Sequence, residues 1–501
     1  MGNNSLNGNR LTSPTVNVKT RDHLRRIETG KLSSPPNGNT SSTSASGYVA
    51  NPDDMDDDGE RRPLLVHQHH THSTLRPEPG FWRHLLFNRQ SSPGIHHANP
   101  LVRWPARAWN VTKVTLFSSW INVLLVFVPL GIVAGMQEWS APSVFTLNFF
   151  AIIPLAAVLS FATEEIAARL GETLGGLVNA TFGNAVELIV SIVALRAGEI
   201  EVVQASMLGS ILSNLLLVLG MCFFLGGINN MRDRNGNGIE QSFAQGTAQT
   251  TCSLMALASA SMILPAALYG VLDRADQENK EASILILSRG TALVLLSLYC
   301  LYLVFALRTH KQLFEPETQN ASADGNEAEH EPLLSPWAAA LVLVAVTLII
   351  SVCADHMVNS IDALVATGKI SKSFIGLILI PIVGNAAEHV TACVVAIKDK
   401  MDLAMGVAIG SSIQIALLVT PALVMLGWAI GQPMTLHFET FQTIAFALSV
   451  LVVTYTVQDG KSNYLEGAML LGLYMIIALA FLASPTDALH KLSSSLSLPW
   501  Q

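Results

Sequence analysis

The chain has 501 residues, of which 50% are hydrophobic and only 13% are charged, about half the charged share of a soluble domain. A net charge of −8, with no basic stripe and no zinc-ligand spacing, argues against a nucleic-acid partner. No nucleophile triad, phosphate-binding loop or catalytic metal motif is present, so we expect neither an enzyme nor a bound cofactor.

Residues 1–110 predict a disordered tail, because they carry little apolar periodicity and no cleavable signal peptide. A histidine tract at His67, His69, His70 and His72 is either incidental or binds a transition metal. The segment from Glu60 to Leu64 and Leu65 resembles an acidic dileucine sorting signal. Chance occurrence and a sorting adaptor as partner both stay open, as does assembly into a homo-oligomer.

Apolar runs after residue 110 are long enough to cross a membrane. They predict an all-α polytopic membrane protein whose principal partner is membrane lipid. We expect about eleven transmembrane helices, near residues 114–135, 142–162, 175–196, 201–228, 243–270, 282–307, 336–362, 374–397, 401–428, 437–457 and 463–483.

Two halves of the chain repeat one another. Gly183-Asn184-Ala185-Val186-Glu187 recurs as Gly384-Asn385-Ala386-Ala387-Glu388, and Gly209-Ser210 recurs as Gly410-Ser411 at the same offset. Each half holds five spans, and an odd number forces opposite orientations. The sequence therefore predicts one extra helix followed by two inverted five-helix repeats.

The domain plan follows from this count. After the tail come an extra first transmembrane helix at 111–136, a first repeat at 142–307, an acidic loop at 308–335, a second repeat at 336–485 and a short tail at 486–501. Arg103, Arg107 and Lys113 precede the first span, which places the N-terminus and the acidic loop in the cytosol. The loop is either a flexible linker or a low-affinity collector of cations.

The two motif glutamates carry the chemistry. A carboxylate inside a membrane span costs about 2.5 kcal/mol or more and usually marks an ion path or a proton relay. Glu187 and Glu388 supply oxygens and two negative charges, which suit a divalent cation such as calcium. Supporting backbone and polar groups are expected from Gly183, Asn184, Gly384, Asn385, Ser210, Asn214, Ser411 and Gln414.

The same glutamates predict coupling to protons. Burial in a low dielectric favours the neutral, protonated carboxyl, whereas a bound cation favours the carboxylate. Calcium and protons therefore compete for one site, as an exchanger requires. Two glutamates serving only as interhelical hydrogen-bonding groups fit the repeated frame poorly.

Three other polar residues each allow more than one interpretation. His389 replaces Leu188 of the first repeat and either tunes selectivity, relays protons or packs between helices. Glu165 and Asp362 occupy related positions and line a proton exit or lie in the solvated interface.

The stretch from Thr181 to Ile189 and the stretch from Gly384 to Val390 resemble the two alpha repeats of the calcium/proton exchanger (CAX) family, in its vacuolar branch. The resemblance covers about residues 110–485. It implies a multi-pass antiporter of the vacuolar membrane that moves calcium into the acidic lumen and protons out, with residues 486–501 lumenal. It also implies that Glu187 and Glu388 bind the cation and exchange the protons. A sodium-coupled or manganese-preferring exchanger and a cation channel are the alternatives.

Overall fold

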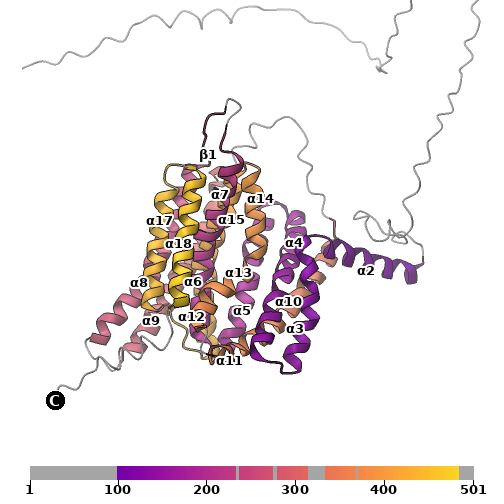
Figure 1. Ribbon diagram of the computed structural model, residues 1–501, viewed down its shortest axis with the longest axis horizontal. Helices are drawn as coiled ribbons and strands as arrows, with labels where there is room; N and C mark the ends of the chain where they lie inside the picture. The colour runs from indigo at the N-terminus through magenta and orange to yellow at the C-terminus, as the bar shows by residue number, and fades with distance from the viewer. Residues whose placement is uncertain (1–98, 233–235, 275–278, 314–332, 368–369, 484–501) are drawn as a thin grey trace, which may run out of the picture. The chain divides into compact units, whose positions relative to one another are not determined.

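A computed structural model gives the fold for residues 99–232, 236–274, 279–313, 333–367 and 370–483, which form helices joined by short connections (Figure 1). The tail motifs around Leu64, the acidic residues from Glu315 to Glu331 and the 486–501 tail lie outside these ranges. Within them, seven helices are long and apolar enough to cross a membrane, or nine if each of two bent helix pairs counts as one span. The predicted all-α membrane fold is confirmed.

The first part of the chain supplies the elements up to the acidic loop. In order they are α2 (Pro100–Leu116), η1 (Trp120–Val126), α3 (Phe127–Met136), α4 (Ala141–Phe182), α5 (Ala185–Arg196), α6 (Ile200–Leu212), η2 (Ser213–Val218), α7 (Leu219–Asn229), β1 (Gln241–Ser242), α8 (Gln245–Arg274), α9 (Lys280–Val304), η3 (Phe305–Thr309) and η4 (Lys311–Leu313).

The second part follows the loop. Its elements are α10 (Pro336–Asn359), α11 (Ile361–Val365), α12 (Lys372–Phe374), η6 (Ile375–Leu379), α13 (Ile380–Gly384), α14 (Ala386–Ile397), α15 (Met401–Gln414), η7 (Ile415–Val419), α16 (Thr420–Ile430), α17 (Thr440–Thr456), β2 (Lys461–Ser462) and α18 (Tyr464–Ala483).

The first expected span differs from a single straight helix over 111–136. Helix α2 ends at Leu116, and the 3-10 helix η1 begins after Ser119, whose hydroxyl accepts the backbone N–H of Ile121. The helices on the two sides of this break meet at 109°. Only η1 and α3 therefore follow the direction of a span, and α2 turns away from it.

The spans that carry the motifs are also broken. Helix α4 divides at Gly171, whose φ of 76° is readily adopted only by glycine. Helix α5 then begins at a second break after Asn184. In the second half, the segment Lys372–Gly384 meets α14 at 59°. Broken helices of this kind are tolerated within a membrane where they line a cavity or are buried in protein.

Close packing between the halves depends on small residues. Gly209 of α6 lies directly against the carbonyl of Leu377 in η6, and Gly467 of α18 lies against the backbone of Phe224 in α7. A stretch of π-helix interrupts the helical run at the same repeat position in each half, as η2 and η7. Such interruptions occur often at functional sites.

The two halves are also joined at one end of the bundle. Strand β1 pairs antiparallel with β2, with Gln241 opposite Ser462, and lies at the end where α7 and α14 finish (Figure 1). Helices α11 and α12 lie at the opposite end (Figure 1).

Candidate functional site

Each motif glutamate lies in the first turn of a helix that begins at a break. Asn184 (φ −98°, ψ 26°) and Asn385 (φ −91°, ψ 4°) leave the helical conformation, and Glu187 and Glu388 follow three residues later. The free N–H groups and the dipole at a helix N-terminus favour a negative charge. Gly183 is itself helical (φ −56°, ψ −43°), so the break falls at the asparagine rather than at the glycine.

Gly384 brings the two glutamates of the two repeats together. A Cβ on Gly384 would lie 2.7 Å from Oε1 of Glu187, so only a glycine leaves room for that carboxylate. Gly384 lies one helical turn before Glu388 along the chain. The Glu187 side chain is only 5% exposed and therefore faces the other repeat rather than lipid.

Hydrogen bonds from the first motif asparagine cross to the second repeat. Asn184 Nδ2 donates to Gln414 Oε1 (2.6 Å), and Ser411 Oγ donates to Asn184 Oδ1 (2.8 Å). Asn214 Nδ2 donates in turn to Ser411 Oγ (3.0 Å). Four of the predicted supporting residues thus form one network around the glutamates.

The second motif asparagine makes no equivalent bonds. Asn385 is fully buried, yet both of its amide atoms lack a hydrogen-bond partner, as does the buried hydroxyl of Ser210. Oε2 of Glu187 and Oε2 of Glu388 are also buried and unpartnered. Each such group costs about 1–3 kcal/mol. Unsatisfied carboxylate, amide and hydroxyl oxygens are the ligands that a hard divalent cation takes.

Carboxylates alone are too few for the site. In the ranges that the structure describes, no group of three or more His, Cys, Asp or Glu side chains is arranged to hold a metal ion. Amide and hydroxyl oxygens therefore have to complete the ligand set of a transported cation, as six to eight oxygens are needed for calcium.

A cavity of about 440 Å³ leads to one of the two glutamates. Glu388, Ser411 and Gln414 line its inner part, and its lining continues to Ala244 and Asp402, near the end of the bundle that carries β1. Glu187 is not among the lining residues. The site is therefore reached from the β1 end, with Glu187 on its closed side.

Several polar residues of the cavity wall were not predicted from the sequence. They include the acids Glu164 and Asp402, together with Asn179 and Thr391. Asp402 also holds the wall in place, because its Oδ1 accepts the backbone N–H of Ala244 (2.7 Å). A polar residue in the first turn of an apolar span, as Asp402 is in α15, is the signal that would have found it.

Neither acid expected at a proton exit lines this cavity. Glu165 is buried and its Oε2 accepts the backbone N–H of Leu334 (2.7 Å), just before α10. Asp362 forms an ion pair at the α11 end, where its Oδ1 lies 2.5 Å from Lys372 Nζ. His389 contacts the hydroxyl of Ser213 through Nε2 (3.2 Å), which places it between the repeats rather than in the cavity wall.

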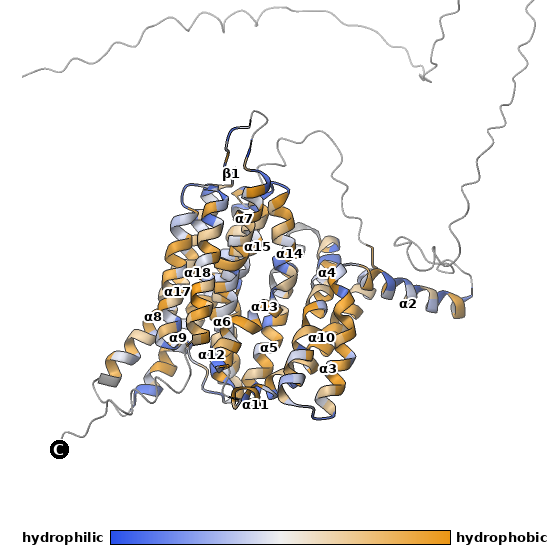
Figure 2. Cartoon of the chain, viewed as in Figure 1, coloured by the Kyte–Doolittle hydropathy of each residue, from blue (hydrophilic) through white to orange (hydrophobic). Residues whose placement is uncertain are grey.

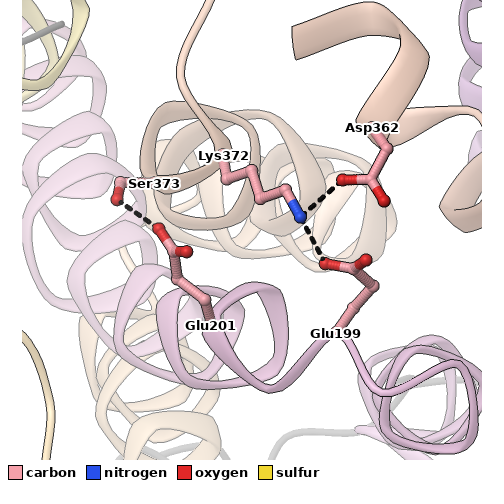
Figure 3. A network of polar contacts seen from close by, with 5 residues as sticks. All are labelled: Glu199, Glu201, Asp362, Lys372 and Ser373. Atoms are coloured by element: carbon pink, nitrogen blue, oxygen red, sulfur yellow. Dashed lines mark hydrogen bonds and ion pairs between the residues drawn. The ribbon is translucent and has the colours of Figure 1, made fainter. Parts of the chain in front are cut away.

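The α11 end is closed by polar contacts across the halves (Figure 3). Lys372 bridges Asp362 and Glu199, with Nζ 2.9 Å from Oε2 of Glu199. Ser373 Oγ donates to Glu201 Oε1 (3.2 Å) and to Glu439 Oε2 (3.4 Å). Burial raises the pKa of Glu439, which directly precedes α17.

Residues 140–308 and 338–483 match the sodium/calcium exchanger protein family. The chain belongs to this family. A vacuolar calcium ion transporter of Schizosaccharomyces pombe is 49% identical over 376 residues, covering 75% of this chain and 87% of the relative. A Ca2+/H+ antiporter of Synechocystis is 43% identical, covering 73% of this chain and 97% of the relative.

Solved structures agree with this membership. The Ca2+/H+ antiporter protein YfkE, in selenium-substituted form, is 34% identical and superimposes with a TM-score of 0.59 over 73% of this exchanger and 99% of YfkE. The similarity covers both repeats, so the motif glutamates of this exchanger lie in the shared part of the fold.

Proposed function

We propose that this protein is a calcium/proton antiporter of the vacuolar membrane, which moves cytosolic calcium into an acidic lumen in exchange for protons. The observation that carries the proposal is the pair of glutamates, Glu187 and Glu388, one from each repeat, next to unpartnered amide and hydroxyl oxygens. Relatives that match across three quarters of this chain are a vacuolar calcium ion transporter and a Ca2+/H+ antiporter.

Competition for the two carboxylates couples the two ions. Glu187 and Glu388 as carboxylates neutralise the charge of one calcium ion, and Asn385, Ser210 and Asn214 offer further oxygens. Without the cation, the buried carboxyls take up protons instead, because an uncompensated buried charge is costly. Since calcium and protons cannot occupy the carboxylates together, each must leave before the other binds.

The direction of access follows from the cavity and the charges. Basic residues lie at both ends of the spans, with Lys398 and Lys400 toward the β1 end and Lys372 at the α11 end. The orientation therefore rests on Arg103 and Arg107, which precede the first span, because basic residues flanking the first span mark the cytosolic side. The cavity reaches Glu388 from the β1 end, and the contacts of Lys372 close the other end. With the N-terminus proposed to be cytosolic, the side of the cavity supports a form that is open toward the cytosol.

Calcium uptake into proteoliposomes tests the function. An acid interior should drive uptake by the wild-type protein, whereas Glu187→Gln and Glu388→Gln should each abolish it. Glu281→Gln, an exposed acid in the first turn of α9, is the matched control and should transport normally. Uptake that ignores the pH gradient, or full activity of either site variant at equal reconstitution, would refute the proposal.

Two further arms of the same assay address the alternatives. Replacing the proton gradient with a sodium gradient should give no uptake if protons are the coupling ion. Excess manganese should compete only weakly if calcium is the preferred cargo. Uptake driven by sodium, or stronger transport of manganese than of calcium, would assign the same site to the alternative exchanger.

A further inference from the structure

Helix α2 is not needed to cross the membrane. After the bend at Ser119, η1 contributes seven residues and α3 ten. At about 2.0 Å per residue in a 3-10 helix and about 1.5 Å in an α-helix, they span roughly 29 Å, close to the roughly 30 Å of a hydrocarbon core. The chain therefore reaches the membrane surface at the bend.

Helix α2 then runs nearly at right angles to the span, with 109° between the two helices. Its start is well defined, because Asn99 Oδ1 accepts the backbone N–H of Leu101 (3.0 Å) and Pro100 occupies the first helical position. A helix that leaves the end of a span at this angle lies along the membrane surface. In Figure 1 it extends sideways from the level of the α4 end.

The residues of α2 divide into two faces. At 100° per residue, Leu101, Trp104 and Trp109 project to one side, and they are 81%, 72% and 40% exposed. Arg103 projects away from this side, and Arg107 lies about 60° beyond Trp104, at its edge. Figure 2 shows α2 as more hydrophilic than α3 beside it. Large exposed aromatic and aliphatic side chains opposite basic ones are typical of a helix that lies in a membrane interface.

The C-terminal turns of α2 hold the helix against the bundle. Val114 is only 2% exposed and packs with Leu334 and Ala339, while Val111 packs against the same group. This contact uses neither Leu101 nor Trp104. The first two turns thus project from the bundle at the height of the membrane surface, with their apolar face open.

We propose that α2 lies in the cytosolic membrane interface, with Leu101 and Trp104 inserted among the acyl chains and with Arg103 and Arg107 beside anionic lipid headgroups. The cytosolic side rests on the proposed orientation, whereas the lipid contact does not. Lipid is the occupant because the apolar face continues the lipid-facing surface of η1, where Trp120 and Val123 are 76% and 79% exposed. Basic side chains at this depth attract anionic headgroups.

Spin labels on the two faces test the proposal. Leu101→Cys and Arg107→Cys are made in a chain whose five native cysteines are replaced, and antiport activity confirms the fold. The labelled protein is reconstituted into phosphatidylcholine, with or without phosphatidylserine. The label at position 101 should be reached by oxygen more than by a water-soluble nickel complex, and the label at position 107 should show the reverse.

Anionic lipid should raise the oxygen-to-nickel ratio at position 101 by about twofold. The paired change Arg103→Gln and Arg107→Gln should remove this dependence and leave calcium uptake unchanged. Nickel access equal at both positions would overturn the proposal. Spin–spin broadening that disappears on dilution with unlabelled protein would also overturn it, because a second copy would then cover the apolar face. Nickel access at position 101 that appears only after deletion of residues 1–98 would overturn it as well.

Discussion

Gly384 offers a way to displace the Glu187 carboxylate without disturbing the rest of the fold. Replacing Gly384 with alanine puts a methyl group 2.7 Å from Oε1 and 3.2 Å from Cδ of Glu187. Ordinary contact begins at 3.4 Å, so the carboxylate has to retreat by about 0.7 Å. Oε1 is the far end of a flexible side chain, and alanine favours the helix by about 0.5–1 kcal/mol over glycine. Folding should therefore survive.

The substitution should instead weaken the binding of the cation. Calcium binds oxygen at about 2.3–2.6 Å, and a retreat of about 0.7 Å takes one carboxylate out of that range. With an effective dielectric constant of about 20, the attraction between a divalent ion and one carboxylate then weakens by at most about 3 kcal/mol. Half-maximal uptake by Gly384→Ala should thus require about ten to a hundred times more calcium.

The matched control for Gly384→Ala is Gly472→Ala in α18, where a new Cβ meets nothing within 4 Å. Calcium-dependent uptake into acid-loaded proteoliposomes gives the apparent affinity, and thermal unfolding in detergent gives the stability. Gly384→Ala should unfold at the temperature of the control and differ only in calcium dependence. Equal calcium affinity in the two variants would show that the Glu187 carboxylate does not bind the transported ion.

Three further changes have different expected outcomes. Gly209→Ala forces a methyl group against the carbonyl of Leu377, so it should destabilise the folded protein by about 1–3 kcal/mol. Thermal unfolding measures this loss, and an unchanged melting temperature would contradict the close packing at Gly209. Glu439→Gln mimics the protonated acid. Because burial raises the pKa of Glu439, the folded state binds its proton more tightly than the unfolded state, and stability rises as pH falls through the raised pKa. The glutamine variant should melt higher than wild type above that pKa and lose the advantage in acid; a pH-independent difference refutes the assignment. Lys372→Gln removes two partly exposed ion pairs, each worth about 1 kcal/mol or less, so uptake should stay within about fivefold of wild type. A complete loss of uptake would show that Lys372 does more than hold the α11 end together.

The repeat and its glutamates could be predicted from the sequence because membrane burial makes every acidic residue conspicuous. Glu187 and Glu388 stand out within apolar runs, and their shared offset pairs them. The hydropathy pattern could not show which of two neighbouring acidic residues lines the cavity. Glu164 lines the cavity and Glu165 does not, because consecutive residues on a helix point about 100° apart and only packing decides which of them faces inward.

Hydropathy did not reveal the bends between helices either. The apolar window that predicted one helix over 111–136 is satisfied by two helices at 109°, since hydropathy records composition and not direction. The partners of Lys372 were hidden for a related reason. Glu199 lies far away along the chain, and only the packing of α12 against α6 brings the two side chains together.

The unequal state of the two motif asparagines follows from inverted repeats that open on one side. Asn184 forms hydrogen bonds with Ser411 and Gln414. In the other repeat, the side-chain amide of Asn385 and the hydroxyl of Ser210, which is the counterpart of Ser411, have no partners. Two equivalent halves cannot both adopt the bonded arrangement while the cavity reaches only Glu388. Part of the asymmetry also lies in the sequence, because the repeat position of Gln414 is Ser213, whose hydroxyl contacts His389. If the site opens at the α11 end instead, we expect Asn184 to lose its bonds and Asn385 to gain one from Ser210.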